Sequence, residues 1–288
     1  MVQSNNLRNN YLENGFVVIK SMFSKDHISN LRPKMIDLSE IIQKNDKEIF
    51  VDEDVQNLLL SEKLIKKIKE ILNTDKLLYF SDSGIVNHID PFKAENGYHN
   101  DARNEDHTIN YENEYPIIRV GVYFENFKDF SGGLKLKERS HKHFCFTFRT
   151  FRLSLLELIK VLFSRSRYNL SSFKLGKSIN LEIEQGDVVI WNLRTHHCGT
   201  SRRLKLFPKL CLQPHIEKLL PNFLYLPTQY KKNRCAMFAT FAKKDLSDSN
   251  ILGYINLKTN LNRIKQIKMR QNLLKLFNKF SLELPNSS

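Results

Sequence analysis

The sequence predicts a mainly β protein of the α+β class, in which helices pack around a sandwich or jelly roll of short strands. From about residue 77 onward, short apolar runs of β type alternate with clusters of turn-forming residues. This pattern favours an antiparallel sandwich or jelly roll over a parallel βαβ sheet. With 288 residues and an apolar fraction of 41%, the chain can bury one large core. No repeat, linker or low-complexity segment divides it, so we expect a single domain over residues 1–288.

The N-terminal part, about residues 1–76, is expected to be mostly helical. A turn at Asn14-Gly15 precedes a short strand over 16–19 and then a helix that Ser24 can cap. Pro33 falls inside that helix, and we expect it to kink or shorten the helix. A second amphipathic helix is predicted over 55–72, where leucines and isoleucines share one face opposite lysines.

The β core is expected over about residues 77–242. Turn-forming clusters such as Ser131-Gly132-Gly133 and Gln185-Gly186-Asp187 separate its strands. The strands are predicted in the runs LLYFSDSGIVNHI, PIIRVGVYFENF, GLKLKE, SINLEIE, DVVIWNL, LKLFPKLCLQP and CAMFATFAK.

Two segments carry a helical pattern instead of a β pattern. One is an insertion near residues 148–167, and the other is the C-terminal tail, residues 243–288. Both combine an apolar face with many basic residues. We expect the apolar faces to pack on the β core, and the alternative is peripheral contact with an anionic membrane.

The net charge of +14 suits an anionic partner such as nucleic acid, a membrane surface or a phosphorylated substrate. We interpret this charge as lysines on a solvated surface, and we expect no nucleic-acid partner because no nucleic-acid-binding motif is present. The polar start MVQSNNLRNN and the lack of a long apolar run predict neither a signal peptide nor a membrane-spanning helix. The four cysteines form no CxxC pair, so we expect reduced thiols and a cytoplasmic protein.

Two short motifs supply side chains that could ligate a metal. In GYHND, residues 97–101, His99 and Asp101 are two positions apart, so a strand would place both on one face. In GDVVIWNLRTHHCGTSRRLKL, residues 186–206, a buried strand ends just before His196-His197. Two histidines and one carboxylate form the facial triad of non-haem Fe(II) sites, whose open positions suit an oxygenase. A hairpin past these histidines would place Arg203 on the adjacent strand, where its planar guanidinium could bind the carboxylate of a 2-oxoacid.

Four segments, in this order, resemble the phytanoyl-CoA dioxygenase family of Fe(II)/2-oxoglutarate-dependent oxygenases. They span residues 11 to about 212 and read YLENGFVVIKSMFSKDHISNLR, YHND, VGVYFENFKDFSGGLKLKERSHK and GDVVIWNLRTHHCGTSRR. The resemblance implies a double-stranded β-helix, which is a cupin-like jelly roll, with helices packed outside it. It also implies that His99 and Asp101 are the proximal iron ligands and His197 the distal ligand, with His196 facing away.

The chain departs from the commoner family pattern in two places. The arginine that holds 2-oxoglutarate commonly lies further beyond the distal histidine, where this chain has Pro208 and Lys209. Some relatives look similar to the shorter arrangement, so the resemblance assigns the co-substrate carboxylate first to Arg203, then to Arg202, then to Lys209. The sequence ERSH, residues 138–141, replaces the usual Pro-Gly-Ser-His, which predicts a different loop there.

By the same resemblance, Fe(II), 2-oxoglutarate and O2 serve a dioxygenase that hydroxylates a small-molecule substrate and releases succinate and CO2. Asp101 favours hydroxylation, because a related halogenase would carry Gly or Ala there to make room for chloride. The apolar and basic insertion suits a lipid-linked, acyl-CoA or sugar-linked substrate. One alternative is a catalytically inactive family member that serves as a basic binding module for anionic ligands or membrane surfaces. A cupin-like enzyme with another metal is less well supported, since its usual His-x-His is absent.

Overall fold

The structure, a computed structural model, describes residues 5–88, 99–102, 114–126, 134–142, 178–199, 204–207, 210–211, 220–225, 234–245, 247–258 and 260–285. Its helices are α1 (Asn5–Asn14), α2 (Lys25–Asn45), η1 (Ile49–Val51), α3 (Glu53–Leu59), α4 (Glu62–Leu72), η3 (Asn222–Leu224), α8 (Ser249–Lys258), α9 (Leu261–Lys268) and α10 (Gln271–Lys279). Its strands are β1 (Phe16–Ile19), β2 (Leu77–His88), β3 (Ile117–Tyr123), β4 (Lys135–Lys137), β5 (Ser178–Asn180), β6 (Val188–Asn192), β7 (His197–Cys198), β8 (Arg234–Lys243) and β9 (Leu282–Glu283).

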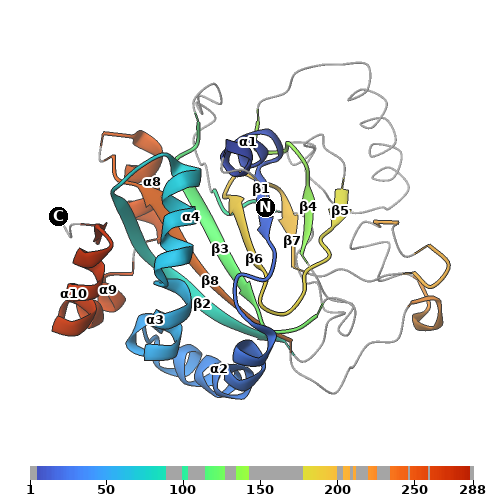
Figure 1. Ribbon diagram of the computed structural model, residues 1–288, viewed down its shortest axis with the longest axis horizontal. Helices are drawn as coiled ribbons and strands as arrows, with labels where there is room; N and C mark the ends of the chain where they lie inside the picture. Colours follow the sequence, from blue (N-terminus) through green and yellow to red (C-terminus); the bar gives the residue numbers. More distant parts are fainter. Residues whose placement is uncertain are drawn as a thin grey trace.

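Two sheets form a jelly roll, which confirms the predicted fold class (Figure 1). The large sheet has the strand order β1-β6-β3-β8-β2-β9, and the small sheet has the order β5-β4-β7. The strand pairs are antiparallel except for β2 and β9, which are parallel. Each sheet therefore joins strands that are distant in the sequence.

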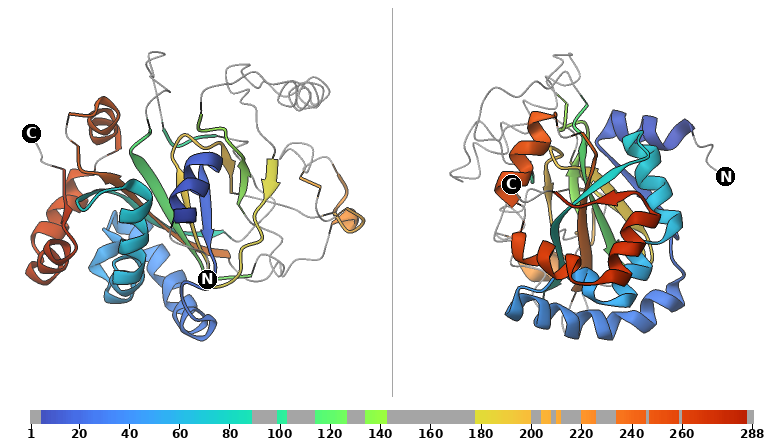
Figure 2. Two further views of the ribbon diagram at one scale, coloured as in Figure 1. Left: turned by 45° about the horizontal axis from the view of Figure 1, so that its top comes forward. Right: turned by 90° about the vertical axis from the view of Figure 1, so that its left-hand side faces the viewer.

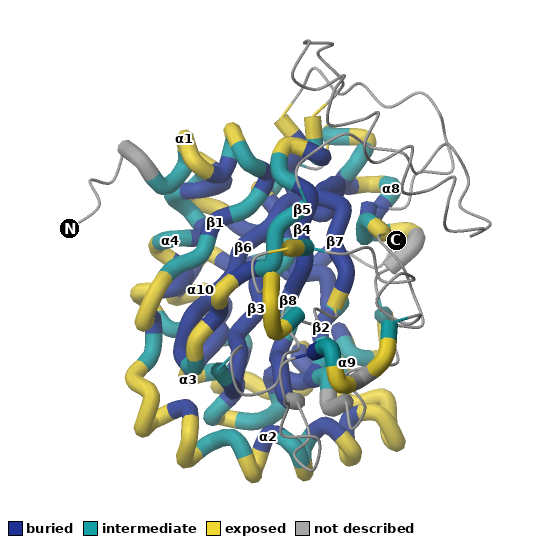
Figure 3. Tube along the Cα trace, turned by 90° about the vertical axis from the view of Figure 1, so that its right-hand side faces the viewer, coloured by how far each residue is buried: buried dark blue, intermediate teal, exposed yellow. Residues whose placement is uncertain are grey.

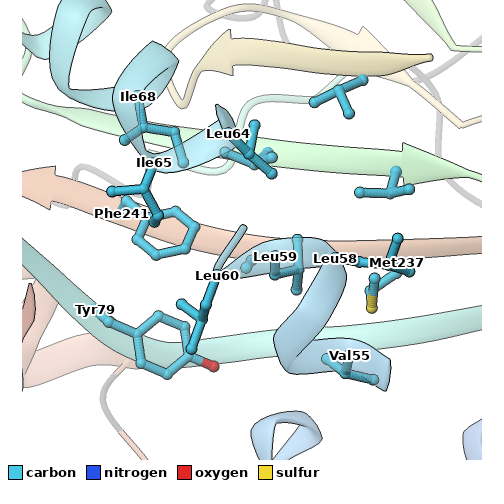
Figure 4. Close-up of a cluster of buried hydrophobic side chains, with 14 of the residues drawn as sticks. Val55, Leu58, Leu59, Leu60, Leu64, Ile65, Ile68, Tyr79, Met237 and Phe241 are labelled. Carbon is cyan, nitrogen blue, oxygen red and sulfur yellow. The ribbon is translucent and has the colours of Figure 1, made fainter. Parts of the chain in front are cut away.

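The outer face of the large sheet is covered by helices. Apolar side chains of α3 and α4, among them Leu59 and Leu64, pack toward Tyr79 of β2 and Phe241 of β8 (Figure 4). Because the side chains of a strand alternate between its two faces, the neighbouring residues of these strands point the other way. Helix α8 packs there, on the opposite side of the sheet from α4 (Figure 2).

A second apolar layer lies between the two sheets. Trp191 and Val189 of the large sheet pack with Leu136 of the small sheet and with Ile183. The strands form the buried centre of the molecule, whereas α2 presents many exposed residues outward (Figure 3). The candidate metal ligands lie beside this layer, next to the end of β6 and at the start of β7.

The N-terminal helices differ from the expected bounds in two places. Helix α2 begins after the Ser24 cap, as predicted, and it runs through Pro33 to Asn45, so the proline does not shorten it. Its buried residues on both sides of the proline, such as Ile28 and Met35, hold the two halves on one core and offset the lost hydrogen bond. The helix predicted over 55–72 is instead two helices, α3 and α4, because Ser61 starts a new helix.

The strand predictions are confirmed for β1 to β6 and for β8, with one exception between β7 and β8. In the run LKLFPKLCLQP, the described residues 204–207 and 210–211 contain only an isolated bridge, between Leu204 and Tyr225. Pro208 has no N–H to donate to a ladder, which is one reason this apolar run does not extend into a sheet. The strand that pairs next to β3 is β8, further along the chain.

The C-terminal tail packs on the core, as expected for an amphipathic segment. Its helices α9 and α10 bury Ile267, Leu273 and Phe277 with the helices that cover the large sheet. The insertion predicted as a helix near 148–167 lies outside the described residues. Within the part of the chain that the structure describes, no helix is both long enough and apolar enough to span a bilayer.

Candidate metal centre

His99 and His197 face each other as a backbone pair. His99 N–H donates to His197 O over 3.0 Å, and His197 N–H donates to His99 O over 2.8 Å. Two residues that exchange both hydrogen bonds lie directly opposite, so their side chains share one face. The two imidazole ring centres are accordingly 4.4 Å apart.

Asp101 completes a group of three possible ligands. Its backbone N–H donates to Leu193 O over 3.0 Å, which ties this segment to the end of β6. The distance from Asp101 Oδ1 to His99 Nε2 is 3.9 Å, and that from Asp101 Oδ2 to His197 Nε2 is 3.6 Å. Among the described residues, these three side chains form the group whose ligand atoms, all within 4.8 Å of one another, could hold a metal ion.

The geometry of this group fits an octahedral metal. With bonds of about 2.1 Å, neighbouring ligand atoms on one face of an octahedron lie about 3 Å apart. Shifts of about an ångström or less in side chains that are already adjacent would bring the group to that spacing. Two imidazoles and one carboxylate are also the donor set that non-haem Fe(II) prefers.

His197 is oriented for binding through Nε2. Its Nδ1 lies 3.0 Å from Thr195 O, and since a carbonyl can only accept, Nδ1 carries the proton. Burial lowers the pKa of His197; the nearby Asp101 carboxylate opposes this shift and His99 adds to it. His197 is therefore a neutral imidazole whose Nε2 lone pair faces Asp101, the state that a metal requires.

His196 points elsewhere, as strand alternation predicts. Its Nε2 lies 3.2 Å from Asn100 Nδ2, and its backbone N–H donates to Ser140 Oγ over 2.8 Å. Asn100 stands between His99 and Asp101 and faces the same way as His196. The predicted arginine Arg203 and its alternatives, Arg202 and Lys209, lie outside the described residues.

Sequence reasoning missed a buried arginine beside the triad. Arg119, in β3, places Nε 3.2 Å from Asp101 Oδ2 and Nη2 2.7 Å from Asp82 Oδ2. Tyr254 of α8 donates its hydroxyl hydrogen to the same Asp82 carboxylate. Burial alone would lower the pKa of the Arg119 guanidinium, but the carboxylates of Asp101 and Asp82 raise it above its ordinary value. Arg119 is therefore a fixed positive charge between two carboxylates.

A bulge in β2 aims Asp82 at Arg119. Between the pairs Tyr79–Phe241 and Ser83–Ala239, β2 has two more residues than β8, and Ser81 adopts a positive φ of 58°. The hydroxyls of Ser81 and Ser83 donate to the buried carboxylate of Glu48 on the outer face. Asp82, between them, is left to face the interior. The Glu48 carboxylate on the outer side of β2 thus fixes the direction of the Asp82 carboxylate on the inner side.

The turn before His197 is held by the N-terminal segment. Gly15 O accepts a hydrogen bond from Thr195 Oγ1 over 2.8 Å and another from Asn192 N–H over 2.9 Å. Gly15 has a φ of 84°, and a Cβ there would lie 2.3 Å from His141 Nδ1 and 2.6 Å from Thr195 Oγ1. Only glycine fits this close approach, so the predicted Asn14-Gly15 turn also supports the metal site.

A charged residue inside an apolar strand was the signal that could have found this network. Arg119 interrupts the run PIIRVGVYF, and Asp82 interrupts LLYFSDSGIV. Charged side chains are seldom buried without a partner, so two such strands in one sheet predict an ion pair. Tyr254, by contrast, carries no such signal in its own helix.

Three solved structures that share this fold have TM-scores of 0.50 with this chain. The TM-score is 0.50 for AviO1 from Streptomyces viridochromogenes Tue57, with 12% identity over 85% of this chain and 96% of that chain. It is also 0.50 for HygX from Streptomyces hygroscopicus with iron bound, with 12% identity over 83% and 86% of the two chains. EvdMO1 gives the same score with 14% identity over 84% of this chain and 50% of its own. No family model and no curated protein matches the sequence.

Proposed function

We propose that this protein is an Fe(II)- and 2-oxoglutarate-dependent dioxygenase that hydroxylates a small-molecule substrate. The observation that carries the proposal is the convergence of His99, Asp101 and His197, from two adjacent segments, at the mouth of a jelly roll. The similarity in fold to HygX, which was crystallised with iron bound, agrees with it. Membership of the phytanoyl-CoA dioxygenase family and a cytoplasmic location are part of the same proposal.

In this proposal each residue has a defined task. His99, Asp101 and His197 hold the iron, and Thr195 O keeps Nδ1 of His197 protonated so that Nε2 is free. Arg119 fixes Oδ2 of Asp101 and offsets the charge of Asp82. When bound, Fe(II) with 2-oxoglutarate and O2 supplies the oxidation: one oxygen atom enters a substrate C–H bond as hydroxyl, the other enters succinate, and CO2 leaves. Arg203 is proposed to bind the distal carboxylate of 2-oxoglutarate.

Succinate production tests the proposal directly. The wild-type protein should convert 2-oxoglutarate to succinate slowly even without substrate, and only when both Fe(II) and O2 are present. Asp101→Ala should abolish both this turnover and tight Fe(II) binding, because one of the three ligands is lost. His196→Gln is the matched control, since His196 neighbours the ligand His197 but faces Asn100. Undiminished turnover in Asp101→Ala would remove the metal assignment, and a folded protein without Fe(II) binding would favour a non-catalytic binding module.

A further inference from the structure

Exposed apolar side chains gather in the segment between β7 and β8, residues 199–233. Leu206 is 81% exposed, Phe207 63% and Phe223 70%. Leu204 pairs with Tyr225, and Lys205 N–H donates to Leu224 O over 2.9 Å. This bridge and this hydrogen bond hold the residues that follow Leu204 beside η3, which contains Phe223, so the exposed side chains lie on adjoining segments. We call the surface formed by Leu206, Phe207, Leu210 and Phe223 the apolar tip.

The apolar tip is anchored to the jelly roll. Tyr225, at the base of the paired segments, is only 2% exposed. Cys211 donates its thiol hydrogen to Asn180 Oδ1 of β5 over 3.2 Å. β5 is an outer strand of the small sheet, so the tip projects from the side of that sheet.

Two stretches of the sequence carry most of the positive charge of the chain, and the segment that holds the apolar tip is one of them. Residues 199–233 contain seven lysines and arginines and one glutamate, a net charge of +6. Residues 144–177, which lead directly into β5, contain seven basic residues and one glutamate and also carry +6. These two segments therefore account for nearly all of the net charge of +14, and both connect to β5.

We propose that the apolar tip inserts into an anionic membrane surface, with basic residues of segments 199–233 and 144–177 other than Arg203 bound to lipid headgroups. Large exposed apolar side chains beside lysines and arginines are the combination that interfacial membrane binding uses. The aromatic Phe207 and Phe223 could stack on the bases of a single-stranded nucleic acid, but the aliphatic Leu206 and Leu210 offer no stacking platform, whereas the acyl-chain region of a membrane accommodates all four side chains.

Membrane binding would define the class of substrate. The tip contacts β5, and His197 begins β7 of the same three-stranded sheet, so docking by the tip would hold the sheet that carries this metal ligand against the membrane. If the proposed hydroxylase function holds, its substrate would then be a lipid or a lipid-linked molecule taken from the bilayer. Membrane binding itself needs no iron, so the two proposals can fail separately.

Vesicle sedimentation of the full chain tests the proposal. Vesicles of phosphatidylcholine with phosphatidylserine should bind the wild-type protein, and vesicles of phosphatidylcholine alone should bind it much more weakly. Leu206→Ser/Phe223→Ser should lower the partition coefficient at least about tenfold, because two exposed apolar groups are lost. Met269→Ser is the matched control: Met269 is 83% exposed but lies after α9, outside the tip, and its loss should leave binding unchanged.

A tryptophan placed in the tip gives a second measurement that does not depend on a loss of binding. Trp191, the one native tryptophan, is 2% exposed and should be insensitive to vesicles. Phe223→Trp should therefore show a blue shift of its fluorescence when phosphatidylserine vesicles are added. Equal binding of the wild type and the Leu206→Ser/Phe223→Ser variant would overturn the proposal. Binding to single-stranded RNA without binding to vesicles would overturn it as well.

Discussion

Replacing Arg119 by Met and Asp82 by Asn together should weaken metal binding at the triad by about 10- to 100-fold, the usual effect of losing a group that orients a ligand. The double substitution removes one positive and one negative charge, so the net charge near the metal is unchanged. A weaker affinity would therefore reflect the lost positioning of Asp101 and not a change in electrostatic potential.

The distance between Arg119 and Asp101 also gives the expected loss of stability when Arg119 is replaced. At an effective dielectric constant of about 20, a charge pair at the 3.2 Å between Arg119 Nε and Asp101 Oδ2 is worth about 5 kcal/mol before desolvation. The pair is partly exposed, 15% for Arg119 and 21% for Asp101, which reduces this value. Arg119→Met alone, which leaves Asp101 and Asp82 uncompensated, should lower the free energy of unfolding by about 3 kcal/mol.

Metal titration of the folded protein under anaerobic conditions, together with urea unfolding of the metal-free protein, measures both effects. The control is Arg32→Met/Glu125→Gln, which removes another largely buried pair, joined over 2.7 Å between α2 and the residues after β3. It should destabilise the protein without changing metal affinity. If Arg119→Met/Asp82→Asn binds metal as tightly as the wild type, Arg119 does not position Asp101 and the reasoning fails.

Two further predictions concern the supports of the site. Gly15→Ala should lower the free energy of unfolding by about 2–4 kcal/mol, because the new Cβ would meet His141 and Thr195 and because the positive φ disfavours alanine. The control is Gly253→Ala, in α8 with no atom near its Cβ, which should leave the free energy of unfolding unchanged or raise it in the same urea assay. Burial raises the pKa of Glu48, so the folded state binds that proton more tightly than the unfolded chain, and this contribution to stability is lost as pH rises through the folded pKa. Glu48→Gln should therefore gain stability relative to the wild type as pH rises from about 4.5 to 7, and a constant difference across that range would contradict this.

The sequence could predict the fold class and the positions of the three proposed ligands. Short strands with turns between them indicate an antiparallel architecture, and His197 begins β7, where an isolated bridge joins it to His99. The resemblance to the family selected His197 over His196, and strand alternation then places His196 on the other face. These are local properties, and local patterns are what a single sequence records well.

The network behind the ligands could not be predicted in the same way. Asp82 and Tyr254 are 172 residues apart, and they meet only because β2 has a bulge and α8 folds back on the inner face of the sheet. The bulge in turn depends on Glu48, whose partners lie in a different element. Such contacts follow from the register of distant strands, which no local pattern specifies. Pro33 shows the reverse case, because core packing on both sides of it keeps α2 continuous where the local rule allowed the helix to end.

The two activities that we propose for this chain depend on different side chains, although Arg203, proposed to bind 2-oxoglutarate, lies within one of the two basic segments. The two segments of +6 lie outside β2, β3, β6 and β8, the strands that build the interior around the triad. Membrane attachment would therefore depend on residues that do not contact the metal ligands, such as Leu206 and Phe223, and metal binding on residues that do not contact lipid. Asp101→Ala should then bind phosphatidylserine vesicles as the wild type does, while the Leu206→Ser/Phe223→Ser variant should bind Fe(II) normally. A substrate that reaches the iron only through the bilayer would be turned over by neither variant, although the second would still release succinate slowly without substrate.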